Sequence, residues 1–272
     1  MPRSHPLYRQ LARVWRLSGR WLPNGWIDAI RQLALFAGAY YLYRLVRGAV
    51  HDQESLALEN ARGLVDFERS IGLFFEPQVH SWAQAQEWLI TASNWMYVNS
   101  HFVVTTTFLI WLYVVRNHAF YYVRNMFMVA MGLALVGYTV YPTAPPRLLP
   151  ELGFTDTVSK FVGEGAADTA HLLYNPYAAV PSMHVAFALM IAVPAVFLVR
   201  NRLLKAIWAL YPTVVTLVVI FTANHWWMDA ALGMLVAGLS AVAASSRTTS
   251  LPRGSPRSTA MPRLPRFDSW NG

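Results

Sequence analysis

Long apolar runs alternate with short polar segments through most of the 272-residue chain. A run close to the roughly 20 residues that cross a bilayer as a helix predicts a membrane span. The candidate spans are residues 28–49, 86–115, 121–141, 178–199, 203–223 and 226–245. The second run is polar in its first half, so it is either a tilted helix or a short helix leading into a span. The pattern predicts an all-α integral membrane bundle of about six transmembrane helices.

The polar stretches outside these runs divide the chain into three parts. Residues 26–245 form the predicted membrane domain, and residues 1–25 form a basic N-terminal segment, either amphipathic at the interface or merely solvated. Residues 246–272 are rich in Pro, Ser and Arg, which is typical of a disordered tail. Within the domain, residues 57–78 have helical apolar spacing and predict a surface helix, which either covers a site or has one face in water.

The charges sort along the chain in a way that predicts its orientation. Hydrophobic residues make up 55% of the chain and charged residues 13%, which excludes an ordinary soluble protein. The net charge of +8 comes largely from arginines near both termini, whereas residues 51–87 and 142–177 hold eleven of the fourteen acids. The positive-inside rule then predicts a multi-pass cell-membrane protein with both termini cytoplasmic, and it argues against nucleic acid as a partner.

Two ionisable residues stand at the start of the last apolar run. His225 and Asp229 are four residues apart, so they share one face of a helix. A carboxylate that accepts a hydrogen bond from one ring nitrogen fixes the imidazole tautomer and leaves the other nitrogen as a nucleophile or metal ligand. A buried ion pair that only joins two helices is the alternative interpretation. The neighbouring Trp226 and Trp227 are expected to anchor the helix at the membrane interface.

A second polar group opens the fourth run. Pro181 suits the first position of a helix, which would place Ser182 and His184 in the first turn. Backbone N–H groups there have no partner within the helix and attract anions, phosphate above all. An ordinary capped helix with an interfacial histidine is the alternative.

The predicted topology brings these groups to one membrane face. The fourth and sixth spans run in the same direction, so His184 and His225 lie near their outer ends, and Arg147 approaches from the preceding loop. Two histidines, a carboxylate, a guanidinium and a helix N-terminus can carry out phosphoryl transfer. We therefore expect an active site at the extracytoplasmic face.

These residues resemble the motifs of a known family. Pro181-Ser182-Met183-His184 resembles the second motif of the type 2 phosphatidic acid phosphatase superfamily, and His225 with Asp229 resembles the core of its third. The resemblance covers residues 50–245. The segment "YPTAPPR", residues 141–147, is similar to a segment of the branch that contains inositol phosphorylceramide synthase and inositolphosphotransferase-like proteins.

The resemblance implies roles for the matching positions. His225 would be the nucleophile that forms a phosphohistidine, Asp229 would orient it, and His184 would protonate the leaving group, with no metal and no cofactor. Arg147 and Ser182 would bind the phosphate. The chain departs from the phosphatase pattern, because Leu148 follows Arg147 and no lysine precedes it at the family's spacing. Val218 and Val219 also replace a Ser-Arg pair.

These departures favour an inositolphosphotransferase-like enzyme over a simple lipid phosphate or polyprenyl diphosphate phosphatase. The expected partners are a lipid phosphate and a hydroxyl-lipid or inositol acceptor. Tyr141 and His101 are further substrate-binding candidates, and His101 with Asn94 and Asn99 would line the cleft or form a buried polar patch.

Three other functions remain as alternatives. A zinc hydrolase would use the two histidines, Asp229 and His171 as ligands. A serine hydrolase built on Ser182 lacks the strand-to-helix turn that such nucleophiles occupy. A transporter would carry ionisable residues across the membrane midplane, whereas here they gather at one rim.

Overall fold

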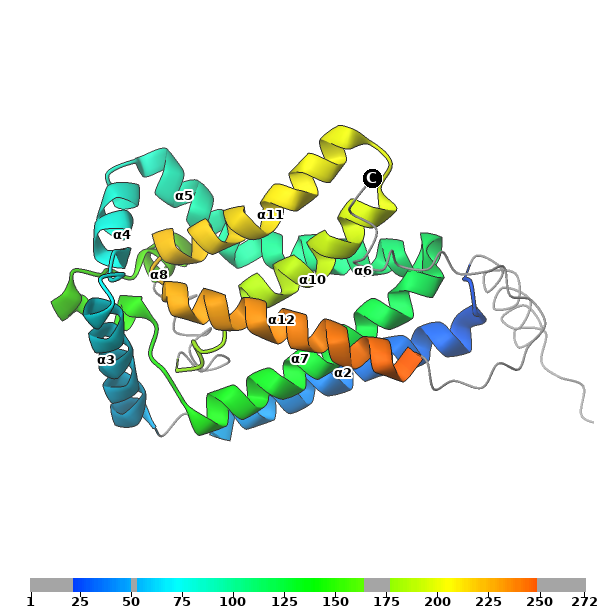
Figure 1. Ribbon diagram of the computed structural model, residues 1–272, viewed down its shortest axis with the longest axis horizontal. Coiled ribbons are helices and arrows are strands. Elements are labelled where there is room, and N and C mark those ends of the chain that lie inside the picture. The colour runs from blue at the N-terminus through cyan, green and yellow to red at the C-terminus, as the bar shows by residue number, and fades with distance from the viewer. Residues whose placement is uncertain (1–21, 50–52, 164–176, 249–272) are drawn as a thin grey trace, which may run out of the picture.

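The computed structural model describes residues 22–49, 53–163 and 177–248, and within these ranges it is helical apart from one isolated β-bridge. The long helices run lengthwise side by side (Figure 1). The helices are α2 (Gly25–Ala49), α3 (Glu54–Ser70), α4 (Glu76–Gln84), α5 (Glu87–Trp95), α6 (His101–Val115), α7 (Asn117–Val140), α8 (Thr157–Val162), α10 (Met183–Leu198), α11 (Arg202–Phe221) and α12 (Trp227–Thr248). A π-helical turn, Met96–Ser100, joins α5 to α6, and two 3₁₀ turns, Pro146–Leu148 and Pro150–Leu152, follow α7.

Four helical segments are long and apolar enough to cross a membrane. They are Glu87–Val115, Asn117–Val140, Arg202–Phe221 and Trp227–Ser245. The prediction of a helical membrane bundle is thus supported for four of its six spans. Of the other two, α10 is apolar but has only 16 residues, and α2 carries Asp28, Arg31, Arg44 and Arg47.

Small side chains let the lengthwise helices pack closely. Ala130 and Ala134 of α7, Ala186 of α10 and Ala237 of α12 are all buried in the largest core cluster. Small residues at helix contacts are typical of membrane bundles, where van der Waals packing replaces the hydrophobic effect between helices. The start of α2 and the end of α12 lie at the same end of this bundle (Figure 1).

A separate group of short helices covers the opposite end. The single predicted helix over 57–78 is two helices, α3 and α4, with a break at Gly72, whose φ of 73° suits glycine. The buried face of α3 includes Ala57, Ala61 and Leu64, and it packs in a second core cluster with Trp226 and the loops after α7 and before α10. In Figure 1, α3, α4 and α8 gather at this end, where α12 begins.

Most of both chain termini lies outside the described residues. The predicted amphipathic segment 1–25 is described only from residue 22, and the predicted tail only to residue 248.

Candidate active site

His225 and Asp229 meet at the start of α12, as the spacing predicts. His225 Nδ1 lies 3.3 Å from Asp229 Oδ2, and the same carboxylate oxygen accepts the N–H of Trp226 at 3.0 Å. Asp229 is fully buried, and His225 is 6% exposed. A carboxylate at Nδ1 holds the proton on that nitrogen and leaves the Nε2 lone pair available for reaction.

The start of α10 differs from the prediction by two residues. Pro181 is not the first helical residue: Ser182 is the N-cap, in an extended conformation, and the helix begins at Met183. The Ser182 N–H donates to the Asp229 carbonyl oxygen at 3.0 Å, so the residue before α10 is attached to the first turn of α12. Ser182 makes no side-chain cap bond, and its buried Oγ has no hydrogen-bond partner.

This contact brings the two predicted motifs together. The rings of His184 and His225 lie side by side, with centroids 5.6 Å apart and planes at 60°. Gly233 permits the approach, since a Cβ there would lie 2.3 Å from the Ser182 carbonyl oxygen. The first turns of α10 and α12 therefore form one tightly packed unit that carries both histidines.

A third histidine, His101, completes a cluster of aromatic rings around His184. The His101 ring centroid lies 4.5 Å from that of His184. The ring of Tyr97 stacks on the His184 ring, with centroids 4.6 Å apart. Both residues belong to or adjoin the π-helical turn Met96–Ser100, a feature often found at functional sites. The buried Nδ1 of His101 has no hydrogen-bond partner.

The two asparagines grouped with His101 in the sequence form hydrogen bonds with other residues. Asn94 is buried and bonds Thr157, donating to its carbonyl oxygen at 3.1 Å and accepting from its hydroxyl at 3.0 Å. Asn99 donates to the Trp95 carbonyl oxygen in its own helix. Their amides are satisfied by neighbouring backbone and side-chain groups, so only His101 of this trio joins the histidine cluster.

Arg147 is buried next to the residues that precede α12. Its guanidinium donates to Asn224 Oδ1, and its Nε lies 3.4 Å from Asp156 Oδ2. Its backbone N–H donates to the Ala223 carbonyl oxygen at 2.9 Å. Arg147 thus lies beside the segment that carries His225, fixed by an amide and a carboxylate.

The loop after α7 is tied to its neighbours by backbone hydrogen bonds. Thr143 exchanges hydrogen bonds with the stretch before α10, accepting from the Ala179 N–H and donating to the Tyr177 carbonyl oxygen. Tyr141 is partly exposed, and its hydroxyl donates to the Asn60 carbonyl oxygen of α3 at 3.2 Å. Tyr141 therefore joins α3 to the loop after α7.

Trp226 is not exposed to lipid or water. It is fully buried, and its indole N–H donates to the Ala144 carbonyl oxygen at 3.0 Å. It packs edge-on against Phe154 at 5.5 Å. The prediction of an interfacial anchor was wrong for Trp226 because α3 and the loop after α7 cover this position.

His80 of α4 is a residue at this end that the sequence analysis missed. Its Nδ1 donates to the Phe221 carbonyl oxygen at 2.7 Å, and its Nε2 accepts the Thr155 N–H at 3.2 Å. Burial lowers the pKa of His80, so it stays neutral and can serve both roles. It thereby joins α4 to the end of α11.

A metal site is not apparent in the part of the chain that the structure describes. No group of three or more His, Cys, Asp and Glu side chains there is arranged to hold a metal ion. His171, proposed as a zinc ligand in one alternative, lies outside the described residues.

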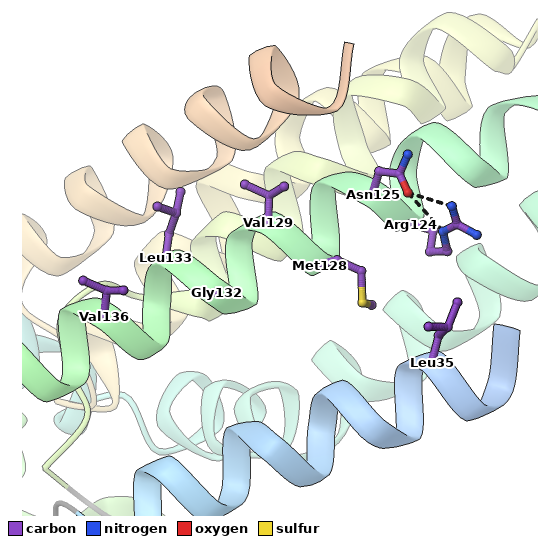
Figure 2. A pocket seen from close by; sticks show the side chains of 8 residues that line it. All are labelled: Leu35, Arg124, Asn125, Met128, Val129, Gly132, Leu133 and Val136. Atoms are coloured by element: carbon purple, nitrogen blue, oxygen red, sulfur yellow. Dashed lines mark hydrogen bonds between the residues drawn. The ribbon is translucent and has the colours of Figure 1, made fainter. Parts of the chain in front are cut away.

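A hollow of about 500 Å³ lies away from the histidines, between α2 and α7. Figure 2 shows its lining, with Arg124 and Asn125 hydrogen-bonded to each other at one end and apolar side chains along the rest. The lining residues are Leu35, Arg124, Asn125, Met128, Val129, Gly132, Leu133 and Val136. None of them belongs to the predicted motifs, so the hollow is not part of the candidate site.

Comparison with known proteins agrees with the resemblance read from the motifs. Residues 62–243 match the family model of the PAP2 superfamily, and this range includes His101, Arg147, Ser182, His184, His225 and Asp229. Comparison with curated proteins and with solved structures gave no match. Because the family match spans well over half of the chain and contains both histidine motifs, the protein belongs to the PAP2 superfamily.

Proposed function

We propose that this protein is a membrane enzyme that transfers a phosphoryl or phospho-headgroup from a lipid through a phosphohistidine. Membership of the PAP2 superfamily and four membrane-length apolar helices support a lipid-phosphate substrate. The observation that carries the mechanism is the pairing of His225 Nδ1 with a buried Asp229 beside the ring of His184.

In the first step, His225 Nε2 attacks phosphorus and the bond to the leaving oxygen breaks. His184, protonated at the start, gives its proton to that oxygen. In the second step, the hydroxyl of the acceptor loses its proton to His184 while its oxygen attacks phosphorus, and the phosphorus–nitrogen bond breaks. His225 is restored, and Asp229 stabilises its charged ring in both steps.

Several groups are available to hold the phosphate oxygens. Arg147 supplies a buried guanidinium, Ser182 an unpartnered hydroxyl, and the first turn of α10 its backbone N–H groups. His101 has a buried ring nitrogen without a partner and lies against His184, which suits a contact with the leaving group or the acceptor. We assign Tyr141 to the rim of the substrate path, because it is partly exposed and attached to α3.

The acceptor separates a transferase from a phosphatase. We favour a hydroxyl-lipid or inositol acceptor, as in the inositolphosphotransferase-like branch, because the positions of a phosphatase-type Ser-Arg pair hold Val218 and Val219. Both valines are buried, and the Val219 carbonyl oxygen accepts the N–H groups of Asn224 and His225. In this chain, Val219 therefore holds the backbone before His225, and neither valine offers a positive charge to bind the phosphate.

We further propose that the site faces the extracytoplasmic side of the cell membrane and that both termini are cytoplasmic. The start of α2 and the end of α12 lie together at the end away from α3 and α4 (Figure 1). The arginines near both termini favour the cytoplasm for that end.

The test uses purified protein in detergent with phosphatidic acid, polyprenyl diphosphate or an inositol phospholipid, with and without a hydroxyl-lipid acceptor and with and without EDTA. We expect an acid-labile phosphoenzyme, activity that resists EDTA, and a headgroup-transfer product when the acceptor is present. Release of inorganic phosphate alone would establish the phosphatase alternative. Loss of activity with EDTA would favour the zinc hydrolase, and absence of turnover on every lipid would contradict the proposal.

Replacing Arg147 with lysine is expected to raise the KM for the lipid phosphate about tenfold, because lysine keeps the charge but loses the planar pair of donors. The measurement is the steady-state KM with a short-chain substrate. Arg62→Lys is the matched control, since Arg62 is exposed and paired with Glu151 at 3.0 Å. An unchanged KM in Arg147→Lys would remove Arg147 from the phosphate site.

A further inference from the structure

Two glutamates are completely buried beside the start of α12. Glu68 lies on α3 and Glu76 on α4, and each is 0% exposed. Burying a carboxyl group is costly unless it is hydrogen-bonded or neutral. Neither residue belongs to the histidine motifs, so their burial needs a separate explanation.

Glu76 has the hydrogen bonds of an ionised carboxylate. Its Oε1 accepts the N–H of Trp227 at 3.1 Å, and its Oε2 accepts the N–H of Phe75 at 3.0 Å. Trp227 is the first residue of α12, so one of the N–H groups left free at that helix end is satisfied by a side chain from α4. Trp227 stands midway between His225 and Asp229, and this bond therefore holds the backbone that carries both.

Glu68, in contrast, has the surroundings of a protonated carboxyl group. Both of its oxygens are buried, and no N–H or O–H group of the described residues donates to them at good hydrogen-bond geometry. The ionisable groups that act on it are Glu76 of α4 and Asp229 of α12, both acidic; the backbone N–H of Met228 favours its ionised form but has the smallest influence. Glu76 already accepts two well-placed N–H groups, so a proton shared by the two carboxyl groups is carried by Glu68.

The electrostatics of the pair agree with this assignment. Burial and the negative charges of Glu76 and Asp229 raise the pKa of Glu68 to about 9. Burial also raises the pKa of Glu76, but the N–H groups of Trp227 and Phe75 act in the opposite direction and favour its ionised form. Glu68 is thus the member of the pair that carries a proton at neutral pH.

We propose that Glu68 and Glu76 are a positioning pair for the nucleophile: ionised Glu76 fixes the first turn of α12, and protonated Glu68 donates to Glu76 and limits the pair to one negative charge. The pair touches neither substrate nor His225, and it acts through the backbone of Trp227. This inference deepens the proposed function, because its catalytic readouts presuppose that His225 is the nucleophile.

The two glutamates are expected to respond differently to the same substitution. Glu68→Gln keeps a neutral donor, so kcat at pH 7 should stay within about threefold of the wild type. Glu76→Gln replaces one acceptor oxygen with an NH₂ group that faces a backbone N–H, so kcat should fall about 10- to 100-fold with KM changed less than threefold. Glu59→Gln, at an exposed position of α3, is the control.

The pH profile distinguishes positioning from simple loss of structure. As pH rises through about 9, Glu68 loses its proton, and the second charge repels Glu76 and Asp229, so wild-type kcat should fall. Glu68→Gln has no such proton to lose, and this alkaline decline should be absent. A Glu68→Gln profile identical to that of the wild type, or equal losses in both variants at pH 7, would overturn the proposal.

A second measurement keeps the test independent of activity. Hydrogen–deuterium exchange should be faster in Glu76→Gln than in the wild type for peptides covering residues 225–232, and unchanged in Glu59→Gln. Unchanged exchange in Glu76→Gln would overturn the positioning role. If the wild type shows no lipid-phosphate turnover, the proposed function fails, whereas faster exchange in Glu76→Gln still supports the contact between Glu76 and α12.

Discussion

Replacing His225 with alanine is expected to lower kcat/KM for a lipid phosphate by on the order of 10⁴-fold or more and to abolish the phosphoenzyme. The His225 imidazole would form the bond to phosphorus, and Asp229, 3.3 Å from its Nδ1, holds the ring in the tautomer that this attack requires. His184→Ala should cost about 10²- to 10⁴-fold, the usual contribution of a general acid. Steady-state kinetics and acid-lability of the labelled protein measure both effects.

The leaving group separates the two histidines. A phosphoester whose leaving group departs as a stable anion needs no proton, so it should restore much of the activity of His184→Ala and none of that of His225→Ala. His118→Ala is the control, because His118 is exposed at the start of α7. Turnover by His225→Ala at the wild-type rate would refute the phosphohistidine mechanism. Equal defects of His184→Ala on both kinds of substrate would refute its role as the acid.

Replacing Gly233 with alanine is expected to destabilise the protein by about 1–3 kcal/mol and to reduce turnover more than tenfold. The added Cβ would lie 2.3 Å from the carbonyl oxygen of Ser182 and 3.2 Å from its carbonyl carbon. These are backbone atoms and cannot rotate away, so the start of α10 must move from α12 and carry His184 away from His225. Thermal unfolding in detergent and kcat on the same preparation measure the two effects.

Gly238→Ala is the matched control in the same helix. A Cβ at Gly238 would meet no atom within 4 Å, and alanine is favoured over glycine inside a helix by roughly 0.5–1 kcal/mol. Gly238→Ala should therefore unfold at the wild-type temperature or slightly higher. If Gly233→Ala were as stable and active as Gly238→Ala, the close contact between α10 and α12 would not be needed for the site.

The parts of the site that sequence predicted best depend on local geometry. Residues four apart share a helix face whatever the rest of the fold does, so the contact between His225 and Asp229 followed from their spacing. The lengthwise helices were predicted from apolar length for the four segments that meet the bilayer criterion. Apolar length predicts a membrane span less well for the other two helices, because α10 has only 16 residues and α2 contains four charged residues.

The parts that sequence analysis missed depend on contacts between distant segments. The Ser182 N–H bonds the Asp229 carbonyl oxygen, 47 residues further along the chain, and no local pattern predicts this contact. Trp226 has the composition of an interface residue, and only the packing of α3 shows that it is buried. Glu76 falls in the predicted surface helix over residues 57–78, where a charged side chain is expected in water. Its burial depends on the Trp227 N–H of α12, which no local pattern reveals.

The residues around the candidate site come from separate helices, so its substrate range can change without a change in the two histidines. The proposed acid and the proposed nucleophile lie on α10 and α12, which are held together by the close contact at Gly233 and the hydrogen bond of the Ser182 N–H. The rings of Tyr97 and His101 reach the same site from the π-helical turn of a third, separate helix. Substitutions in that turn can therefore reshape the space around a new acceptor while the reacting pair is left intact, and relatives with different substrates should differ there first.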